Sequence, residues 1–224
     1  MKIPKGAIFD LDGTLLDSMG VWREIDVEFL ARRGFSVPDD YIRAITAMHY
    51  QAAAEYTIQR FGLRERPEDV VAEWNHMAEE IYARHVFLKP FAREYLELLK
   101  SSGTRIAAAT ASAEGLYLPA LQNNGAQGYF DAFTTVTEVS RGKGFPDIYL
   151  LTARKLGLAP EDCVVYEDIL AGVRGAKAGG FFACGVYDRH SAYEWEEIRR
   201  LADRSITGWQ ELLGESLRKG EKDT

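Results

Sequence analysis

Five short apolar segments alternate with amphipathic segments along most of this 224-residue chain, and this alternation restricts its fold more than any other feature. The apolar segments are too short for helices and read as buried strands, at residues 6–9, 104–109, 132–136, 163–166 and 181–186. Helical patterns at 92–100 and 148–156 separate them, each closely followed by a glycine. The order predicts an α/β fold with a doubly wound parallel sheet.

Residues 16–88 break this alternation. They contain no convincing strand, and Gly34, Pro38, Gly62 and Pro67 divide them where helix breaks are expected. The helical segments are predicted at 21–33, 38–47, 50–61 and 67–85. We therefore expect an α/β core made of residues 1–15 and 89–224, and an all-helical cap, 16–88, inserted above the C-terminal edge of the sheet. An insert so placed is suited to act as a lid that chooses the substrate.

The composition narrows the class of partner. A net charge of −7 provides no basic patch, which argues against nucleic acid and anionic membrane surfaces. No window approaches the length of apolar residues that crosses a bilayer, and both cysteines lie inside predicted strands, as buried reduced thiols do. We expect a cytoplasmic protein, a monomer or weak dimer, that acts on a small molecule.

Two carboxylates follow the first predicted strand, in the sequence Asp10-Leu-Asp12-Gly13-Thr14. Acidic side chains at a strand end commonly serve a metal or a reaction, although a lone Asp-Gly is more often a turn. A calcium loop requires glycine at its sixth position and glutamate at its twelfth. Counted from Asp10, those positions hold Leu15 and Val21, so this alternative fails.

Polar groups also follow other predicted strands. The hydroxyl of Thr110 and the small residue Ala111 suit phosphate binding through a side-chain oxygen and backbone amides, although threonine is common at strand ends. Glu167 and Asp168 are adjacent carboxylates that could equally begin a helix. Their coincidence with Asp10 and Asp12 at one edge of a sheet favours a common site.

Four carboxylates in one crevice repel each other unless a cation compensates them. Ligands that are all oxygen favour Mg²⁺. Lys143, in Gly142-Lys143-Gly144-Phe145-Pro146-Asp147, is the candidate for a protein cation, and a solvated surface lysine is its alternative interpretation.

These residues resemble the motifs of the haloacid dehalogenase superfamily, in the group similar to β-phosphoglucomutase and phosphoglycolate phosphatase, whose Rossmann-like core carries a helical cap. The resemblance spans nearly the whole chain, and its motifs occur in the family order: Asp10 to Thr14, Thr110, Lys143 to Asp147, and Glu167 with Asp168. Two departures are visible. Gly144 stands where the group usually has proline after the lysine, and Phe91 stands where a glycine often follows Lys89-Pro90.

The resemblance implies a mechanism. Asp10 would attack phosphorus and form an aspartyl-phosphate, while Asp12 would protonate the leaving alcohol and later deprotonate water. Lys143 and Thr110 would hold the phosphoryl oxygens. Mg²⁺ would be held by the side chain of Asp10, the backbone carbonyl of Asp12, and Glu167 and Asp168. A dehalogenase would not need these Mg²⁺ ligands, and a protein that only binds phosphate would not need Asp12.

The cap residues bear on the substrate. Trp22, Thr46, His49 and Tyr50 are candidate substrate contacts, with helix packing as the alternative interpretation. Trp22, Thr46 and Tyr50 stand where β-phosphoglucomutases carry a histidine and two cap cations that hold a second phosphate. We therefore expect a phosphatase that hydrolyses a small phosphorylated metabolite such as a sugar or polyol phosphate, with a sugar-phosphate mutase as the alternative.

Overall fold

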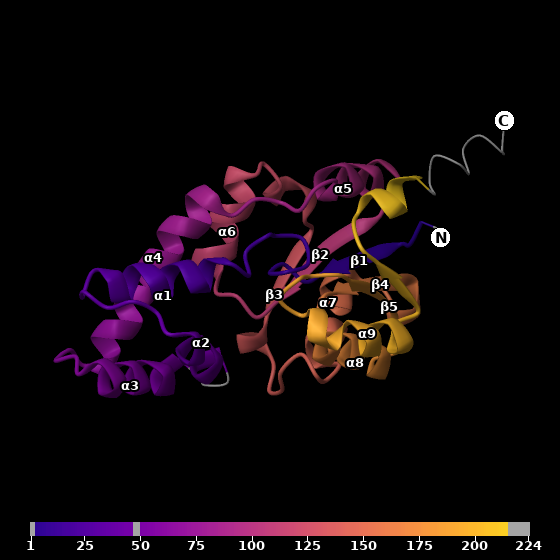
Figure 1. The fold of residues 1–224 in the computed structure, drawn as a ribbon. Coiled ribbons are helices and arrows are strands. Elements are labelled where there is room, and N and C mark those ends of the chain that lie inside the picture. Colours follow the sequence, from indigo (N-terminus) through magenta and orange to yellow (C-terminus); the bar gives the residue numbers. More distant parts are fainter. Residues whose placement is uncertain (1–2, 47–49, 215–224) are drawn as a thin grey trace. The chain divides into compact units, whose positions relative to one another are not determined.

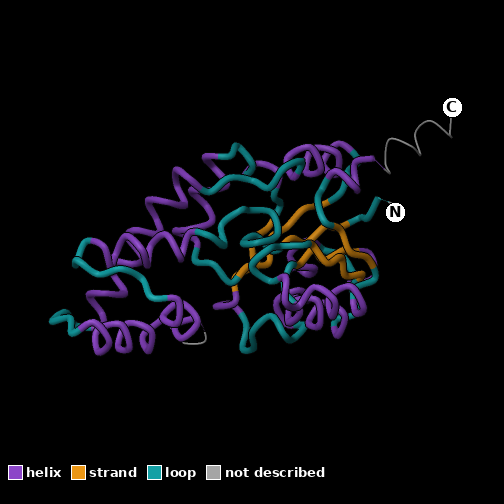
Figure 2. Tube along the Cα trace, in the orientation of Figure 1, coloured by secondary structure: helices purple, strands orange, loops and turns teal. Residues whose placement is uncertain are grey.

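The computed structural model describes residues 3–46 and 50–214, which divide into two compact units. Unit 1 contains residues 1–18 and 87–224, and unit 2 contains residues 19–86. Figure 1 shows the elements of both units, and Figure 2 separates helices from strands by colour. In the described part of the chain, no helix has the length and apolar character that crossing a membrane requires.

Unit 1 is built on a six-stranded parallel sheet, which confirms the predicted α/β core. The strand order is β3-β2-β1-β4-β5-β6. The bounds are β1 Gly6–Phe9, β2 Arg105–Thr110, β3 Ala132–Thr135, β4 Cys163–Glu167, β5 Phe182–Val186 and β6 Arg204–Ile206. Because β1 lies between β2 and β4, the chain passes to opposite sides of β1 at this point. Such a switch point is where open α/β sheets bind their ligands.

Helices cover both faces of this sheet (Figure 1). Alternate residues of each strand point to opposite faces, so one face buries Ile8 and Val165 against α7 and α8. The other buries Phe9 and Tyr166 against Tyr95 of α5 and Trp209, with the Phe9 and Tyr166 rings stacked 4.6 Å apart. The helices of unit 1 are α5 Ala92–Ser101, α6 Glu114–Asn123, α7 Asp147–Leu156, α8 Leu170–Ala178 and α9 Trp195–Leu201.

Unit 2 is helical, with α1 Val21–Ala31, α2 Asp39–Thr46, α3 Tyr50–Phe61 and α4 Pro67–His85. The long helix α4 packs against both α1 and α3. Phe29 of α1 meets Trp74 of α4 edge to face, with ring centroids 5.5 Å apart. Arg33, just beyond α1, forms ion pairs with Glu65 and Glu73 at 2.8 and 2.6 Å.

The structure contains one strand, β6, and three helices, α6, α8 and α9, for which no residue range was predicted. The strand β6 was not predicted, because its three residues, Arg204, Ser205 and Ile206, have no apolar run. Its pairing with β5 supplies the hydrogen bonds that a polar edge segment needs, and this pairing is not encoded in the local sequence. The other five strands end within one residue of their predicted bounds.

The departure at Phe91 has a structural consequence. Phe91 adopts a left-handed backbone conformation, φ 65° and ψ 3°, directly before α5. It is the one non-glycine residue with positive φ among residues 3–46 and 50–214. A residue with a Cβ atom is strained there, whereas glycine is not. Gly144, the other departure, lies in open space without positive φ.

We expect Phe91→Gly to have a free energy of unfolding about 1 kcal/mol higher than that of Phe91→Ala, because glycine removes the left-handed strain that alanine keeps. The phenylalanine side chain is 49% exposed, and both variants lose the same buried part of the ring, so this loss cancels between them. Urea denaturation of the two variants measures the difference. Phe91→Ala is the matched control, since it removes the ring and keeps the strain. Equal stabilities of the glycine and alanine variants would contradict this account.

Candidate active site

The candidate site lies where β1 and β4 end side by side. Phe9 pairs with Tyr166 in the register of the two strands, and the backbone N–H of Asp10 donates to the Tyr166 carbonyl at 3.0 Å. Asp10 therefore leaves β1 beside Glu167, the last residue of β4, and Asp168. Carboxyl ends of parallel strands meet at one edge, so residues separated by more than 150 positions come together.

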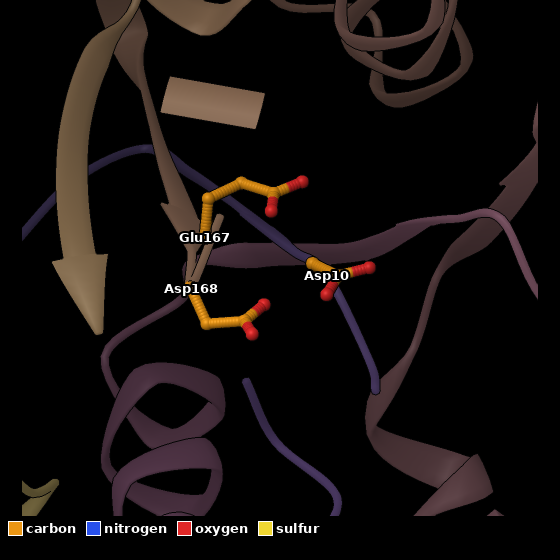
Figure 3. Close-up of side chains that lie close together, drawn as sticks. All are labelled: Asp10, Glu167 and Asp168. Carbon is orange, nitrogen blue, oxygen red and sulfur yellow. The ribbon is translucent and has the colours of Figure 1, made fainter. Parts of the chain in front are cut away.

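The carboxylates of Asp10, Glu167 and Asp168 form a compact, buried cluster. One oxygen of each lies within 4.8 Å of the others. Figure 3 shows Glu167 and Asp168 leaving consecutive positions, with both carboxylates turned toward Asp10. Lys143 donates hydrogen bonds from Nζ to Asp10 and to Glu167, the latter at 2.7 Å. Tyr149 of α7 donates to the same Glu167 oxygen at 2.7 Å.

Burial shapes the charge state of this cluster. Burial raises the pKa of Glu167 to about 7, and the ammonium of Lys143 only partly offsets it. Burial, together with the charges of Asp10 and Glu167, raises the pKa of Asp168 to about 8. Burial alone would lower the pKa of Lys143, but Asp10 and Glu167 outweigh it and raise this pKa. The lysine thus stays charged and compensates only part of the negative charge.

Asp12 is held apart from this cluster. The hydroxyl of Ser18 donates to its Oδ1 at 2.6 Å, and the hydroxyl of Ser112 donates to its Oδ2. The two aspartates of the motif therefore have different surroundings, one in an ionic cluster and one between hydroxyls.

Two threonines complete the polar surroundings. The hydroxyl of Thr14 lies 3.2 Å from Asp10 Oδ2 and 3.0 Å from Asp168 Oδ1, and so links two of the carboxylates. Thr110 is the last residue of β2, and its Oγ1 accepts from the Ser112 N–H at 3.0 Å. Ala111, between them, is exposed. The loop after β2 thus presents backbone beside a buried hydroxyl.

The carboxylate cluster fits a divalent cation. Its three side chains offer oxygen ligands only, which Mg²⁺ prefers. Within the described residues, Glu167 Oε2 is buried and accepts no hydrogen bond. An ion would satisfy this atom and offset the charge that Lys143 leaves uncompensated.

Gly172 of α8 gives Glu167 its space. A Cβ atom at position 172 would lie 2.3 Å from the Glu167 Cδ and 2.5 Å from Oε2, closer than atoms approach in proteins. Position 172 therefore requires glycine, because α8 passes so close to the Glu167 carboxylate that a larger residue would clash with it. No local pattern in the sequence predicts this contact between Gly172 and Glu167.

We expect Gly172→Ala to displace Glu167 and to lower Mg²⁺ affinity or activity by about 10- to 100-fold, as changes beside metal ligands do. A titration of activity against Mg²⁺ concentration measures the effect. Gly128→Ala is the matched control, because no atom lies within 4 Å of its added Cβ. An unchanged Mg²⁺ dependence in Gly172→Ala would contradict the assignment of Glu167.

The predicted cap contacts fall in unit 2. Trp22 lies on α1, where its ring packs near Tyr82 of α4, with centroids 6.5 Å apart. Thr46 ends α2 and Tyr50 begins α3, and their side chains lie outside the described part of the structure. His49 lies outside the described residues altogether. A substrate role for these four residues stays a prediction.

Several polar partners in the site were not predicted. Tyr149 occupies an apolar position of a helical pattern, and nothing local distinguishes it from a core tyrosine. Ser18 and Ser112 have no motif of their own. The only signal for Ser112 was its place two residues after Thr110.

Comparison with known proteins places these residues in a family context. The sequence model of the family of haloacid dehalogenase-like hydrolases matches residues 4–180 of this chain. A phosphorylated carbohydrates phosphatase from Thermotoga maritima is 27% identical, over 79% of this chain and 82% of its own. Hexitol phosphatase A from Escherichia coli K12 is 32% identical, over 79% of this chain and 80% of its own. The solved structure of a candidate beta-phosphoglucomutase from Thermotoga maritima has a TM-score of 0.82 and 25% identity, covering 94% of this chain and 99% of its own.

Proposed function

This chain belongs to the haloacid dehalogenase-like hydrolases and is a phosphoric monoester hydrolase, and we propose that it is a Mg²⁺-dependent phosphatase of sugar or polyol phosphates. The observation that carries the proposal is the separation of the two aspartates. Asp10 lies in the carboxylate cluster, and Asp12 lies between two serine hydroxyls. This arrangement suits a nucleophile and a separate proton carrier.

In the first step, a carboxylate oxygen of Asp10 forms a bond to phosphorus while the bond to the ester oxygen breaks. Asp12 gives its proton to that leaving oxygen, so an alcohol departs rather than an alkoxide. Ser18 and Ser112 form hydrogen bonds with the two oxygens of the Asp12 carboxyl.

In the second step, water attacks the phosphorus of the aspartyl-phosphate. Asp12, now ionised, takes the proton of the water, and the bond between phosphorus and the Asp10 oxygen breaks to release inorganic phosphate. The same residue thus serves as acid and then as base, which returns the enzyme to its starting state.

Positive charge and hydroxyl donors stabilise the phosphoryl group. Lys143 already contacts Asp10, so its ammonium is placed beside the oxygens that the group would bring, and Thr110 supplies a hydroxyl at the end of β2. Asp10, the backbone carbonyl of Asp12, Glu167 and Asp168 would hold Mg²⁺. The bound ion supplies charge that reduces repulsion between the anionic nucleophile and the anionic phosphate.

Unit 2, in this proposal, is the cap that chooses the substrate. Supporting it are the insertion of the unit between the first motif and β2, and the partly exposed aromatic side chain of Trp22 on α1. The relatives named for phosphorylated carbohydrates and hexitol phosphates indicate a polyhydroxylated leaving group. The cytoplasmic location and the monomeric or weakly dimeric state stay predictions.

A sugar-phosphate mutase is the second candidate, because the structure of a candidate beta-phosphoglucomutase matches the chain over nearly its whole length. A mutase must hold a bisphosphate intermediate through its second phosphate, for which cationic side chains are the usual partners. Thr46 and Tyr50 stand where β-phosphoglucomutases carry the two cap cations, and neither residue is a cation, which favours hydrolysis.

A panel of monoesters tests the proposal. Hexose phosphates, hexitol phosphates, phosphoglycolate and p-nitrophenyl phosphate are each incubated with the enzyme, with Mg²⁺ or with EDTA. Inorganic phosphate is assayed together with isomers of β-glucose 1-phosphate. We expect stoichiometric phosphate release that requires Mg²⁺ and is fastest for a hexose or hexitol phosphate. Isomerisation without phosphate release would favour the mutase, and phosphate release that EDTA does not affect would contradict the metal assignment.

A further inference from the structure

Lys89 makes three polar contacts that the mechanism does not use. It lies where the chain returns to unit 1, and its Nζ donates to the backbone carbonyl of Gly13, between Asp12 and Thr14. The same Nζ lies 3.2 Å from the Tyr187 carbonyl and 2.8 Å from Asp188 Oδ2. An ammonium has three hydrogens, so these contacts account for all of them. The side chain is only 14% exposed.

Asp188 is a fixed anchor for this ammonium. It is 4% exposed, and its other oxygen accepts from the backbone N–H of His190 at 2.8 Å, with His190 Nδ1 at 3.0 Å. It follows β5, the neighbour of the strand that ends at Glu167. Lys89 thus ties the end of β5 to the loop of the first motif.

The backbone of Lys89 is fixed as well. Its N–H donates to the Leu15 carbonyl at 2.7 Å, and the N–H of Asp17 donates to the Phe87 carbonyl at 2.9 Å. The segments leaving and re-entering unit 1 are therefore paired through their backbones. From this rigid base the Lys89 side chain reaches the loop that contains Asp12.

The loop turns at Gly13. This glycine has φ 79°, and glycine is the residue with the widest backbone freedom. Its N–H donates to the Leu16 carbonyl at 3.0 Å, and its own carbonyl, in the peptide that joins Gly13 to Thr14, accepts from Lys89. Lys89 therefore holds the backbone one residue after Asp12, whereas Asp10 is anchored separately to β4 by its backbone N–H.

We propose that Lys89 is a positioning residue for the general acid: by fixing the Gly13 carbonyl, it holds Asp12 in the orientation that protonates the leaving alcohol. The inference rests on the proposed role of Asp12. Because Asp10 is anchored independently, loss of Lys89 affects proton transfer more than nucleophilic attack.

The dependence on the leaving group distinguishes this role from a purely structural one. An alkyl phosphate needs a proton on its leaving oxygen, whereas p-nitrophenolate departs as a stable anion without one. We expect Lys89→Met to lower kcat about 100-fold for the fastest hexose or hexitol phosphate of the panel, with KM nearly unchanged. For p-nitrophenyl phosphate the loss is about threefold or less, because general acid catalysis contributes little there. Asp12→Asn is measured alongside as the reference for loss of the acid.

Lys100→Met is the matched control. Lys100 also contacts one carboxylate, Asp131 at 2.7 Å, and one carbonyl, that of Tyr129 at 3.1 Å, but it lies on α5 away from the motif loop. The kcat of Lys100→Met for both esters is expected to match that of the wild type. Asp188→Asn removes the charge of the anchor and is expected to show the same selective loss, to a smaller degree. It decides the question if Lys89→Met does not fold.

The outcomes separate the two proposals. A wild type that hydrolyses both esters supports the proposed function by itself. With that activity present, an equal loss for both esters in Lys89→Met and in Asp188→Asn overturns the positioning role alone, as does a loss confined to KM. A wild type that hydrolyses neither ester overturns the proposed function and this inference together.

Discussion

Replacing Asp10 with asparagine is expected to abolish phosphate release and to leave the fold intact. The amide has nearly the shape of the carboxylate, and its oxygen can still accept from Thr14 or Lys143. An amide is a poor nucleophile, so no aspartyl-phosphate forms, and kcat should fall by roughly 10⁴-fold or more. The substitution also removes a buried carboxylate. Burial raises the pKa of this carboxyl group, which means that its charged form is unfavourable in the folded state, so the free energy of unfolding should not decrease.

Phosphate release in saturating Mg²⁺ measures the activity, and urea denaturation measures the stability. Asp131→Asn serves as the control, because Asp131 is a carboxylate of the same unit that pairs with Lys100 outside the site. Its activity should match that of the wild type. Substantial turnover by Asp10→Asn, after intact-mass analysis excludes deamidation, would contradict the nucleophile assignment.

Lys143→Met should lower both activity and metal-free stability. Its ammonium contacts Asp10 and Glu167 and is 7% exposed, so its loss leaves the buried carboxylates without this compensation. Breaking a buried ion pair by removing one partner costs about 3–5 kcal/mol, less whatever protonation of the carboxylates recovers. We expect kcat to fall by about 10²- to 10³-fold, the usual range for loss of a charge-stabilising donor.

Mg²⁺ should stabilise Lys143→Met more than it stabilises the wild type, because the ion then offsets charge that the lysine no longer offsets. Urea denaturation with Mg²⁺ and with EDTA measures this difference. If the metal-free variant does not fold, its Mg²⁺-dependent refolding gives the same information. Lys100→Met, which loses a half-exposed lysine, should respond to Mg²⁺ as the wild type does. An equal response of Lys143→Met and the wild type would contradict a shared carboxylate cluster.

Local signals in the sequence predict most elements of the fold. The helix at 50–61 is followed by Gly62, which has φ 64°, and the helix at 67–85 begins at a proline, which suits the first helical turn. These residues act through their own backbone preferences, so their effect is readable without tertiary structure. The strand β6 shows the opposite case, since only its neighbour β5 makes its polar residues a strand.

The sequence also indicated which polar residues follow the strand ends. Parallel strands place all their carboxyl ends at one edge, so Asp10, Asp12, Glu167 and Asp168 were expected together. The structure brings one oxygen each of Asp10, Glu167 and Asp168 within 4.8 Å of the others, and the Asp12 carboxyl is not part of this cluster. That expectation needed only strand order and direction. The residues that contact the site from outside its motifs, such as Tyr149 at Glu167 and Lys89 at the Gly13 carbonyl, are ordinary helix and loop residues in the sequence.

The sequence by itself determined the α/β class, the helical character of residues 50–61 and 67–85, and the set of acidic residues at the strand ends, because these depend on periodicity and local backbone preference. Tertiary structure alone decided the different surroundings of Asp10 and Asp12. Hydrogen bonds from Ser112 to Asp12 and from Lys143 to Asp10 join positions 100 and 133 residues apart in the chain, and the directions of such side chains are set by packing, which no local pattern records.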